Sequence, residues 1–209
     1  DTDHQSFDNG AFDYALQQEA NGNENYIKSL DLLDQSKVTA VLSQLNIAQN
    51  GVSADDLYYG SKLPFAYNYV DKNTDVTHDN DTQSEHGSHV AGIAAANKYV
   101  PQTDGDETTY VSALDTVKTQ GVAPEAQLLV MKVFGTNGGA YDSDYMAAIE
   151  DAIVLGADSI NLSLGSSYPG PSKYTAYMDA DTDPVPVYQA ILDSLASKDA
   201  VVSISAGNS

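Results

Sequence analysis

Apolar residues recur at helical spacing between residues 27 and 50, which is the first clear hydrophobic pattern in the chain. These residues are Ile27, Leu30, Leu33, Val38, Val41, Leu42 and Leu45. Gly51 follows them, at the position where glycine commonly ends a helix. The pattern therefore predicts a helix over 27–50, and the polar residues 1–25 before it predict a loop or a short helix.

Residues 62–120 divide into four segments of different composition, and each predicts an element of its own. Residues 62–71, "KLPFAYNYVD", alternate and are aromatic, which predicts a strand. Residues 71–85 are acidic without periodicity and predict a solvent-facing loop, while "HGSHVAGIAAANK" from residue 86 predicts a small-residue helix. The polar residues 100–120 are expected to loop out.

After residue 125 the predicted elements alternate between strands and helices. They are strands at 126–134, 158–165 and 201–208 and helices at 143–157 and 187–200. The run 126–134 is nearly all apolar, as in a strand covered on both faces. Ser143 is a candidate helix cap and Gly156 a helix terminator, while residues 166–186 hold four of the seven prolines and predict a surface loop.

This alternation is typical of a parallel sheet with right-handed crossovers, so the predicted class is α/β. In such sheets the functional residues lie beyond the carboxyl ends of the strands. The residues at the carboxyl ends of the three strands, 135–140, 163–166 and 206–209, are therefore expected along one edge.

Composition excludes several functions. The 209 residues carry a net charge of −21, from 30 acidic and 9 basic residues, which argues against a nucleic-acid partner. Cysteine is absent, which excludes disulfides and thiolate chemistry, and no apolar run reaches the ~20 residues that span a bilayer. The charge fits solubility in a salty or extracellular setting, or attraction of calcium or basic substrates. Since the chain opens at Asp1 in a loop-like segment, we expect a processed piece of a longer protein.

His86 and His89 stand three residues apart in "SEHGSHVAGIAAA" and allow three interpretations. A metal site lacks the i, i+4 spacing and intervening Glu of the metalloprotease helix. Packing or capping at a helix start suits His89. A catalytic base is the third interpretation, and it depends on the rest of the chain.

Four segments, "EHGSHVAG", "GVAPEAQLLVMKVF", "GADSINLSLG" and "VVSISAGNS", follow one another in an order that resembles the subtilisin-like serine protease (subtilase) family. The resemblance covers roughly 60–209 and, more loosely, the first seven residues. It is strongest to the large cell-envelope proteinases, the lactocepin-type enzymes and the streptococcal complement-cleaving peptidases. It implies a three-layer fold whose mainly parallel sheet is flanked by helices and is incomplete here, with a variable region at 1–60 and the core at 61–209.

The resemblance also implies the roles of individual residues. His86 would be the general base of an Asp-His-Ser triad, and the Asn208 amide would donate to the oxyanion of the tetrahedral intermediate. Two edges would bind an extended substrate backbone, and a pocket would hold the side chain before the scissile bond. The edges are Gly138, Gly139 and Ala140 and Ser163, Leu164 and Gly165, and the pocket residues are Ala206 and Gly207. Plain turns remain the alternative for Asn208 and for the two glycines.

The triad aspartate and serine are not found in the chain. The family holds the aspartate in Asp-Thr-Gly or Asp-Ser-Gly at a strand end and the serine in Gly-Thr-Ser-Met-Ala, and neither run occurs here. The opening "DTDHQSF" resembles the run just after that aspartate, so Asp1 is disfavoured as the triad acid. We therefore expect a chain that is inactive alone and needs the remainder of its parent. A non-catalytic peptide-binding module is the alternative.

The remaining expectations concern ligands and location. The resemblance implies a protein or peptide substrate and a secreted or cell-surface location. No cofactor is required for the chemistry. A structural calcium ion in loop 71–85 is an option, but this loop lacks the pattern of an EF-hand, and a solvated acidic loop is the favoured interpretation.

Overall fold

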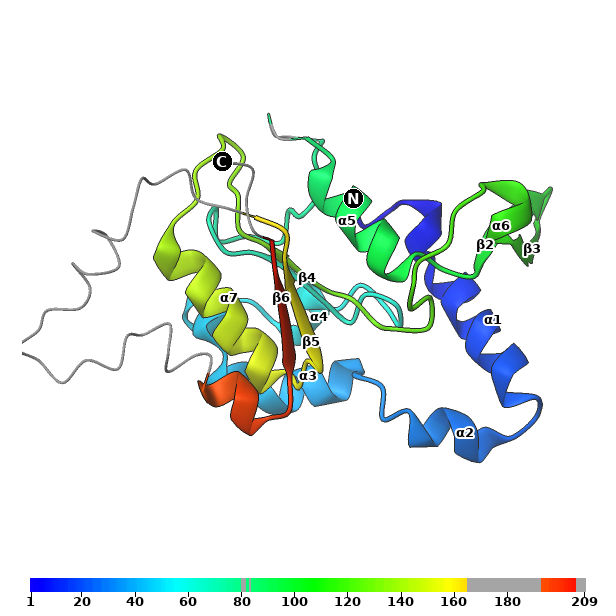
Figure 1. The fold of residues 1–209 in the computed structure, drawn as a ribbon, viewed down its shortest axis with the longest axis horizontal. Helices are drawn as coiled ribbons and strands as arrows, with labels where there is room; N and C mark the ends of the chain where they lie inside the picture. Colours follow the sequence, from blue (N-terminus) through cyan, green and yellow to red (C-terminus); the bar gives the residue numbers. More distant parts are fainter. Residues whose placement is uncertain (80–81, 83, 165–192, 206–209) are drawn as a thin grey trace, which may run out of the picture. The chain divides into compact units, whose positions relative to one another are not determined.

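The computed structural model describes residues 1–79, 82, 84–164 and 193–205 (Figure 1). The chain forms two compact units, Asp1–Ala148 and Ile149–Ser209. In each unit a pair of parallel strands occurs together with helices. The predicted α/β class is therefore confirmed.

The first unit opens with a 3-10 turn, η1 (Gln5–Phe7), and a helix, α1 (Asn9–Ala20). The Asp8 carboxylate starts α1 by accepting the backbone N–H of Ala11 at 2.7 Å. Phe12 and Leu16, one turn apart, are buried on its inner face. The polar residues 1–25 thus contain a full 12-residue helix, longer than the loop or short helix that composition predicted.

The single helix predicted over 27–50 is wrong, because this stretch is divided into short pieces. They are α2 (Glu24–Ser29), α3 (Gln35–Val41), η2 (Leu42–Gln44) and η3 (Asn46–Asn50), and α4 (Ala54–Leu57) follows. Asp31 has a φ of 50°, and the Asp34 carboxylate accepts the Lys37 N–H at 2.9 Å, so a new helix starts there. The Gln127 side chain binds both the N–H and the C=O of Leu33 between the pieces. Gly51, with a φ of 73°, ends η3 as expected of a terminating glycine.

Two parallel strands, β1 (Phe65–Asn68) and β4 (Leu129–Lys132), form the centre of this unit, with Phe65 opposite Leu129. Both lie inside the predicted strands and are shorter. β1 is fully buried, whereas all four residues of β4 are half-buried, so the expectation of a strand covered on both faces is wrong for β4. Among the described residues this sheet has two strands, which leaves one edge of β4 without a neighbouring strand.

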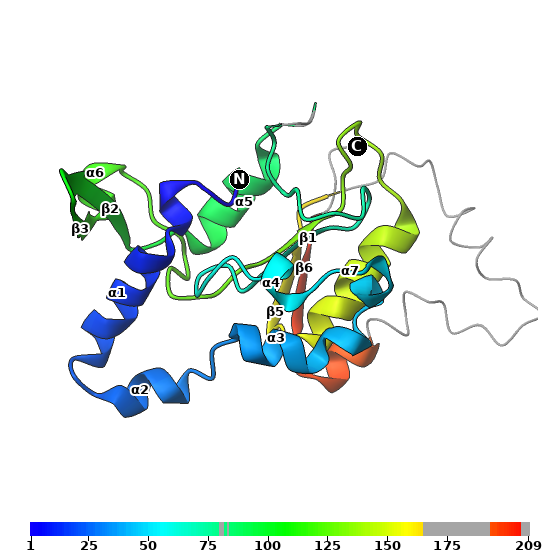
Figure 2. The same ribbon diagram turned by 180° about the vertical axis from the view of Figure 1, so that it is seen from behind.

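The small-residue helix predicted from residue 86 is confirmed as α5 (His86–Ala95). The loop predicted at 100–120 is wrong. Here β2 (Tyr99–Asp104) and β3 (Glu107–Ser112) form an antiparallel hairpin, and α6 (Ala113–Thr116) follows. Gly105, with a φ of 61°, provides the turn. The hairpin lies beside α1 (Figures 1 and 2). The rings of Tyr99 and Tyr110 pack on Tyr14 of this helix.

Helix α7 (Asp142–Val154) runs across the boundary into the second unit. It already includes Ser143, so the prediction of Ser143 as its cap is wrong. Gly156 follows its end with a φ of 83°, as expected of a terminator. In the second unit β5 (Ser159–Leu162) and β6 (Val201–Ile204) pair in parallel, with Ser159 opposite Val201. Residues 193–197 are helical, while the predicted loop 166–186 lies outside the described residues.

Candidate active site

His86 is the first residue of α5, and its side chain is exposed. Glu85 precedes the helix, and its carbonyl accepts the N–H of His89 at 2.9 Å. Within the described part of the chain, no hydrogen bond or ion pair involves the side chain of His86. An exposed imidazole at a helix start is accessible to a substrate and to residues that the described structure does not contain.

The N-terminus of the chain lies against the same helix turn. The Asp1 amine donates a hydrogen bond to Ser88 Oγ, two residues after His86. Burial, followed by the positive charge of Lys132, lowers the pKa of this amine. No carboxylate of the described residues, that of Asp1 included, pairs with His86.

The segment 121–123 closes the other end of α5. The N–H groups of Gly121, Val122 and Ala123 donate to carbonyls of the last helical turn and the residue after it at 2.9–3.0 Å. A Cβ built on Gly121 would lie 2.3 Å from the backbone nitrogen of Ala96, so only glycine fits. The "GVAP" run therefore has a structural role at the helix that begins with His86.

The side chain of Lys62 contacts the residues that follow Ala123. Its side chain is fully buried, and Nζ donates to the carbonyls of Pro124 at 2.9 Å and Ala126 at 2.7 Å. Burial lowers the pKa of Lys62 to about 7, against an opposing effect of Glu125. The sequence did not single out this residue, because nothing in the pattern of residues 62–71 indicates that the lysine at the start of the predicted strand is buried.

The loop after β4 contains the predicted substrate residues Gly138, Gly139 and Ala140. It is a turn, in which Gly135 N–H donates to the Gly139 carbonyl and Gly138 N–H to the Gly135 carbonyl, both at 2.8 Å. Gly138 has a φ of 79°. Among the described residues no hydrogen bond uses the Gly139 N–H or the Ala140 carbonyl. The backbone groups that an added peptide strand needs are thus present here, and the role of this edge stays a prediction.

A polar cluster, Asn68, Asp71 and Thr136, joins this loop to the end of β1. Asp71 Oδ2 accepts the Thr136 N–H at 2.7 Å, the Thr136 hydroxyl at 2.9 Å and the Asn68 amide at 2.9 Å. The Thr136 N–H and then the Asn68 amide lower the pKa of Asp71, so it carries a negative charge at neutral pH. Asp71 and Asn68 are functional candidates that sequence reasoning did not single out.

The other predicted edge lies in the second unit. Ser163 and Leu164 follow β5, and the Leu164 carbonyl accepts the Ser205 hydroxyl at 2.7 Å. Asn161 donates to Ser163 Oγ at 2.9 Å. The remaining predicted site residues, Gly165, Ala206, Gly207 and Asn208, lie outside the described residues.

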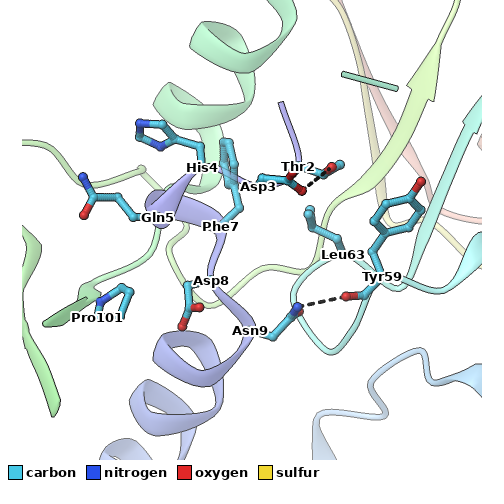
Figure 3. A pocket seen from close by; sticks show the side chains of 10 residues that line it. All are labelled: Thr2, Asp3, His4, Gln5, Phe7, Asp8, Asn9, Tyr59, Leu63 and Pro101. Carbon is cyan, nitrogen blue, oxygen red and sulfur yellow. Dashed lines mark hydrogen bonds between the residues drawn. The ribbon is translucent and has the colours of Figure 1, made fainter. Parts of the chain in front are cut away.

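A cavity of about 340 Å³ lies among the first residues of the chain, where Asn9 donates to the Tyr59 carbonyl at 2.9 Å (Figure 3). Neither His86 nor residues 138–140 line it. Over the part of the chain that the structure describes, no three His, Asp or Glu side chains are grouped to hold a metal ion. Equally, no described helix is long and apolar enough to cross a membrane.

Together these features define an α/β protein in which an accessible histidine opens a helix and a glycine-containing turn leaves backbone groups free. A family model described as "Subtilase family" matches residues 33–209. The chain therefore belongs to the subtilase family, as its motifs predicted.

Similar proteins agree with this placement. The chain is 43% identical over 112 residues to the PI-type proteinase of Lactococcus lactis subsp. cremoris, which is 52% of this chain and 5% of the relative. It is 42% identical over 84 residues to the C5a peptidase of Streptococcus pyogenes, 40% of this chain and 6% of the relative. The minor extracellular protease Vpr of Bacillus subtilis is 36% identical over 115 residues, 53% of this chain and 12% of the relative. The chain thus spans a small part of these relatives, which include a lactococcal proteinase and a streptococcal peptidase, as its motifs predicted.

Proposed function

We propose that this chain is part of the catalytic domain of a serine endopeptidase that works through an acyl-enzyme. The observation that carries the proposal is the family match over 33–209 combined with the exposed His86 at the start of α5. His86 acts as the general base, and the Asn208 amide donates to the oxyanion. The triad carboxylate and the serine are supplied by the rest of the protein.

The reaction runs in two halves. The serine oxygen attacks the peptide carbonyl carbon while His86 takes the hydroxyl proton. Asn208 stabilises the negative charge that develops on the carbonyl oxygen. The tetrahedral intermediate collapses, the C–N bond breaks, and His86 gives its proton to the leaving amine. Water then attacks the ester with His86 again as base, which releases the carboxylic acid product and restores the serine.

The substrate is an extended segment of a protein or peptide. Its backbone pairs with the edge Gly138–Ala140 and with the edge Ser163–Gly165, and Ala206 and Gly207 line the pocket for the side chain before the scissile bond. The triad chemistry needs no cofactor, and a calcium ion, if bound in the acidic loop, has a structural role only. A secreted or cell-surface location is supported by the relative from Bacillus subtilis, which is named an extracellular protease.

Labelling with a fluorophosphonate, which bonds covalently to an activated serine, tests the proposal. Intact mass is measured for the full-length protein, for its His86→Ala and His89→Ala variants and for the 209-residue chain. We expect labelling of the full-length protein and of His89→Ala only, because the serine is not activated without its base. Loss of the corresponding histidine lowers kcat by ~10⁶ in subtilisin.

His89→Ala is the matched control, since His89 is an exposed histidine of the same helix. Folding of each variant is checked by circular dichroism. A folded full-length protein that takes no label would contradict the enzyme and favour the non-catalytic peptide-binding module. Labelling that survives in His86→Ala would contradict the role of His86.

A further inference from the structure

The cluster Asn68, Asp71 and Thr136 connects two segments that are far apart in the sequence. Asp71 follows β1, Thr136 follows β4, and the two residues are 65 positions apart. Three donors converge on one carboxylate oxygen, Asp71 Oδ2. Hydrogen bonds to a charged acceptor are among the stronger ones in proteins, so this contact holds the start of the 135–140 loop against the end of β1.

Other contacts reinforce the same attachment. The Thr136 carbonyl accepts the N–H of Thr82 at 3.2 Å. A Cβ built on Gly135 would lie 2.7 Å from Val70 Cγ1, so the loop passes directly over the residue before Asp71. The Asn68 side chain is itself buried and bonds the Asp75 carbonyl at 3.1 Å, which fixes the amide that it offers to Asp71.

The free backbone groups of the loop lie a few residues further on. Gly139 N–H and the Ala140 carbonyl are the groups left for a peptide strand, three and four residues after Thr136. Addition of a strand requires several backbone hydrogen bonds in register, and these weaken steeply when a donor or acceptor is displaced. The position of Thr136 therefore decides whether Gly139 N–H and the Ala140 carbonyl are placed to pair with a peptide strand.

We propose that Asp71 is a positioning residue that holds the 135–140 loop in the geometry needed to bind an extended peptide. The proposal rests on the proposed function, because it concerns the substrate edge of that site. Asp71 acts through Thr136 and touches neither the substrate nor the reacting atoms. Its effect is accordingly confined to substrates long enough to reach residues 138–140.

Steady-state kinetics of Asp71→Asn in the full-length protein test this inference. Two substrates are compared: an extended peptide that reaches the loop, and a short amide that occupies only the pocket before the scissile bond. We expect KM for the extended peptide to rise about tenfold, the size expected for a lost hydrogen bond to a charged group. We expect kcat, the short substrate and fluorophosphonate labelling to stay unchanged.

Asp75→Asn is the matched control. Asp75 lies in the same acidic loop, and its carboxylate accepts from the N–H and the hydroxyl of Thr77 within that loop. Thr136→Val, which removes the hydroxyl donor, should raise KM less than Asp71→Asn. The double variant Asp71→Asn/Thr136→Val should have nearly the same KM as Asp71→Asn alone, since both changes act on one contact.

Three results would overturn the role of Asp71. They are an unchanged KM for the extended peptide, an equal loss for the short substrate, or the same loss in Asp75→Asn. Absence of labelling in the unmutated protein is instead a failure of the proposed function. In that case equilibrium titration of the same extended peptide into the wild type and Asp71→Asn still decides the role of Asp71.

Discussion

Lys62 places an amine in the interior of the first unit. Its Nζ is bonded to two backbone carbonyls and lies 5.0 Å from the ring centroid of Phe12. Burial disfavours the charged form by more than the Glu125 carboxylate favours it, and the pKa of Lys62 falls to about 7. The unfolded chain keeps the ordinary lysine pKa of about 10.4.

The stability of the protein should therefore depend on pH through Lys62. Between about pH 7 and 10 the unfolded state binds a proton that the folded state does not, so the free energy of unfolding rises with pH. Lys62→Met removes this titration and should flatten the rise. Urea unfolding of both proteins at pH 7 and 9.5 measures the change in the free energy of unfolding with pH. An equal change in the two proteins would contradict a neutral buried amine.

At the residue scale, the sequence predicted His86 at the start of a helix because its neighbours carry the helix signal. It did not predict Lys62 or Asp71. The partners of Lys62 at 124 and 126 and the partner of Asp71 at 136 are more than 60 positions away. No local pattern states which distant backbone groups a side chain will meet.

At the element scale, the end of α5 depends on Gly121. Its N–H donates to the Ala96 carbonyl at 2.9 Å, and backbone atoms of Ala95 and Ala96 fill the space where a side chain would stand. A methyl group at this position forces the 121–123 segment away from the carbonyls that it satisfies.

Gly121→Ala should lower the free energy of unfolding by about 2 kcal/mol, as overpacking commonly does. Gly92→Ala is the matched control, because a Cβ on this glycine of α5 meets nothing within 4 Å. It should be neutral or stabilise by up to about 1 kcal/mol through higher helix propensity. Chemical denaturation measures the free energy of unfolding of both variants. Equal values would show that segment 121–123 accommodates a methyl group without loss of stability.

Elements that follow a local rule were predicted, and those made by tertiary contacts were not. The glycine ends at Gly51 and Gly156 and the helix from His86 are local. The break within 27–50 involves Gln127, and the hairpin at 99–112 packs on Tyr14. Helical spacing and polar composition were misleading at these two places because distant partners decided the structure.

At the scale of the whole molecule, the net charge of −21 is the main electrostatic feature that affects stability. Over the part of the chain that the structure describes, ion pairs such as Lys98–Glu19 and Lys37–Asp31 involve few of the acidic residues. Repulsion among the remaining carboxylates opposes the compact state, and salt screens it over a Debye length of about 8 Å at 0.15 M.

The unfolding midpoint should therefore rise by a few degrees when sodium chloride increases from about 10 to about 150 mM. Thermal unfolding followed by circular dichroism measures this shift. Calcium chloride at equal ionic strength is the comparison, and a larger rise with calcium would indicate bound ions beyond screening. A midpoint that falls with salt would mean that the ion pairs outweigh the repulsion.

The sequence by itself determined the family, the α/β class and the position of His86 at a helix start, because motif order and short-range spacing are properties of the chain. Only the tertiary structure decided that Lys62 is buried under the "GVAP" segment and that Asp71 holds the loop at Thr136. These contacts depend on which segments pack together. Packing sums many weak interactions between residues far apart in the chain, and no stretch of sequence contains that sum.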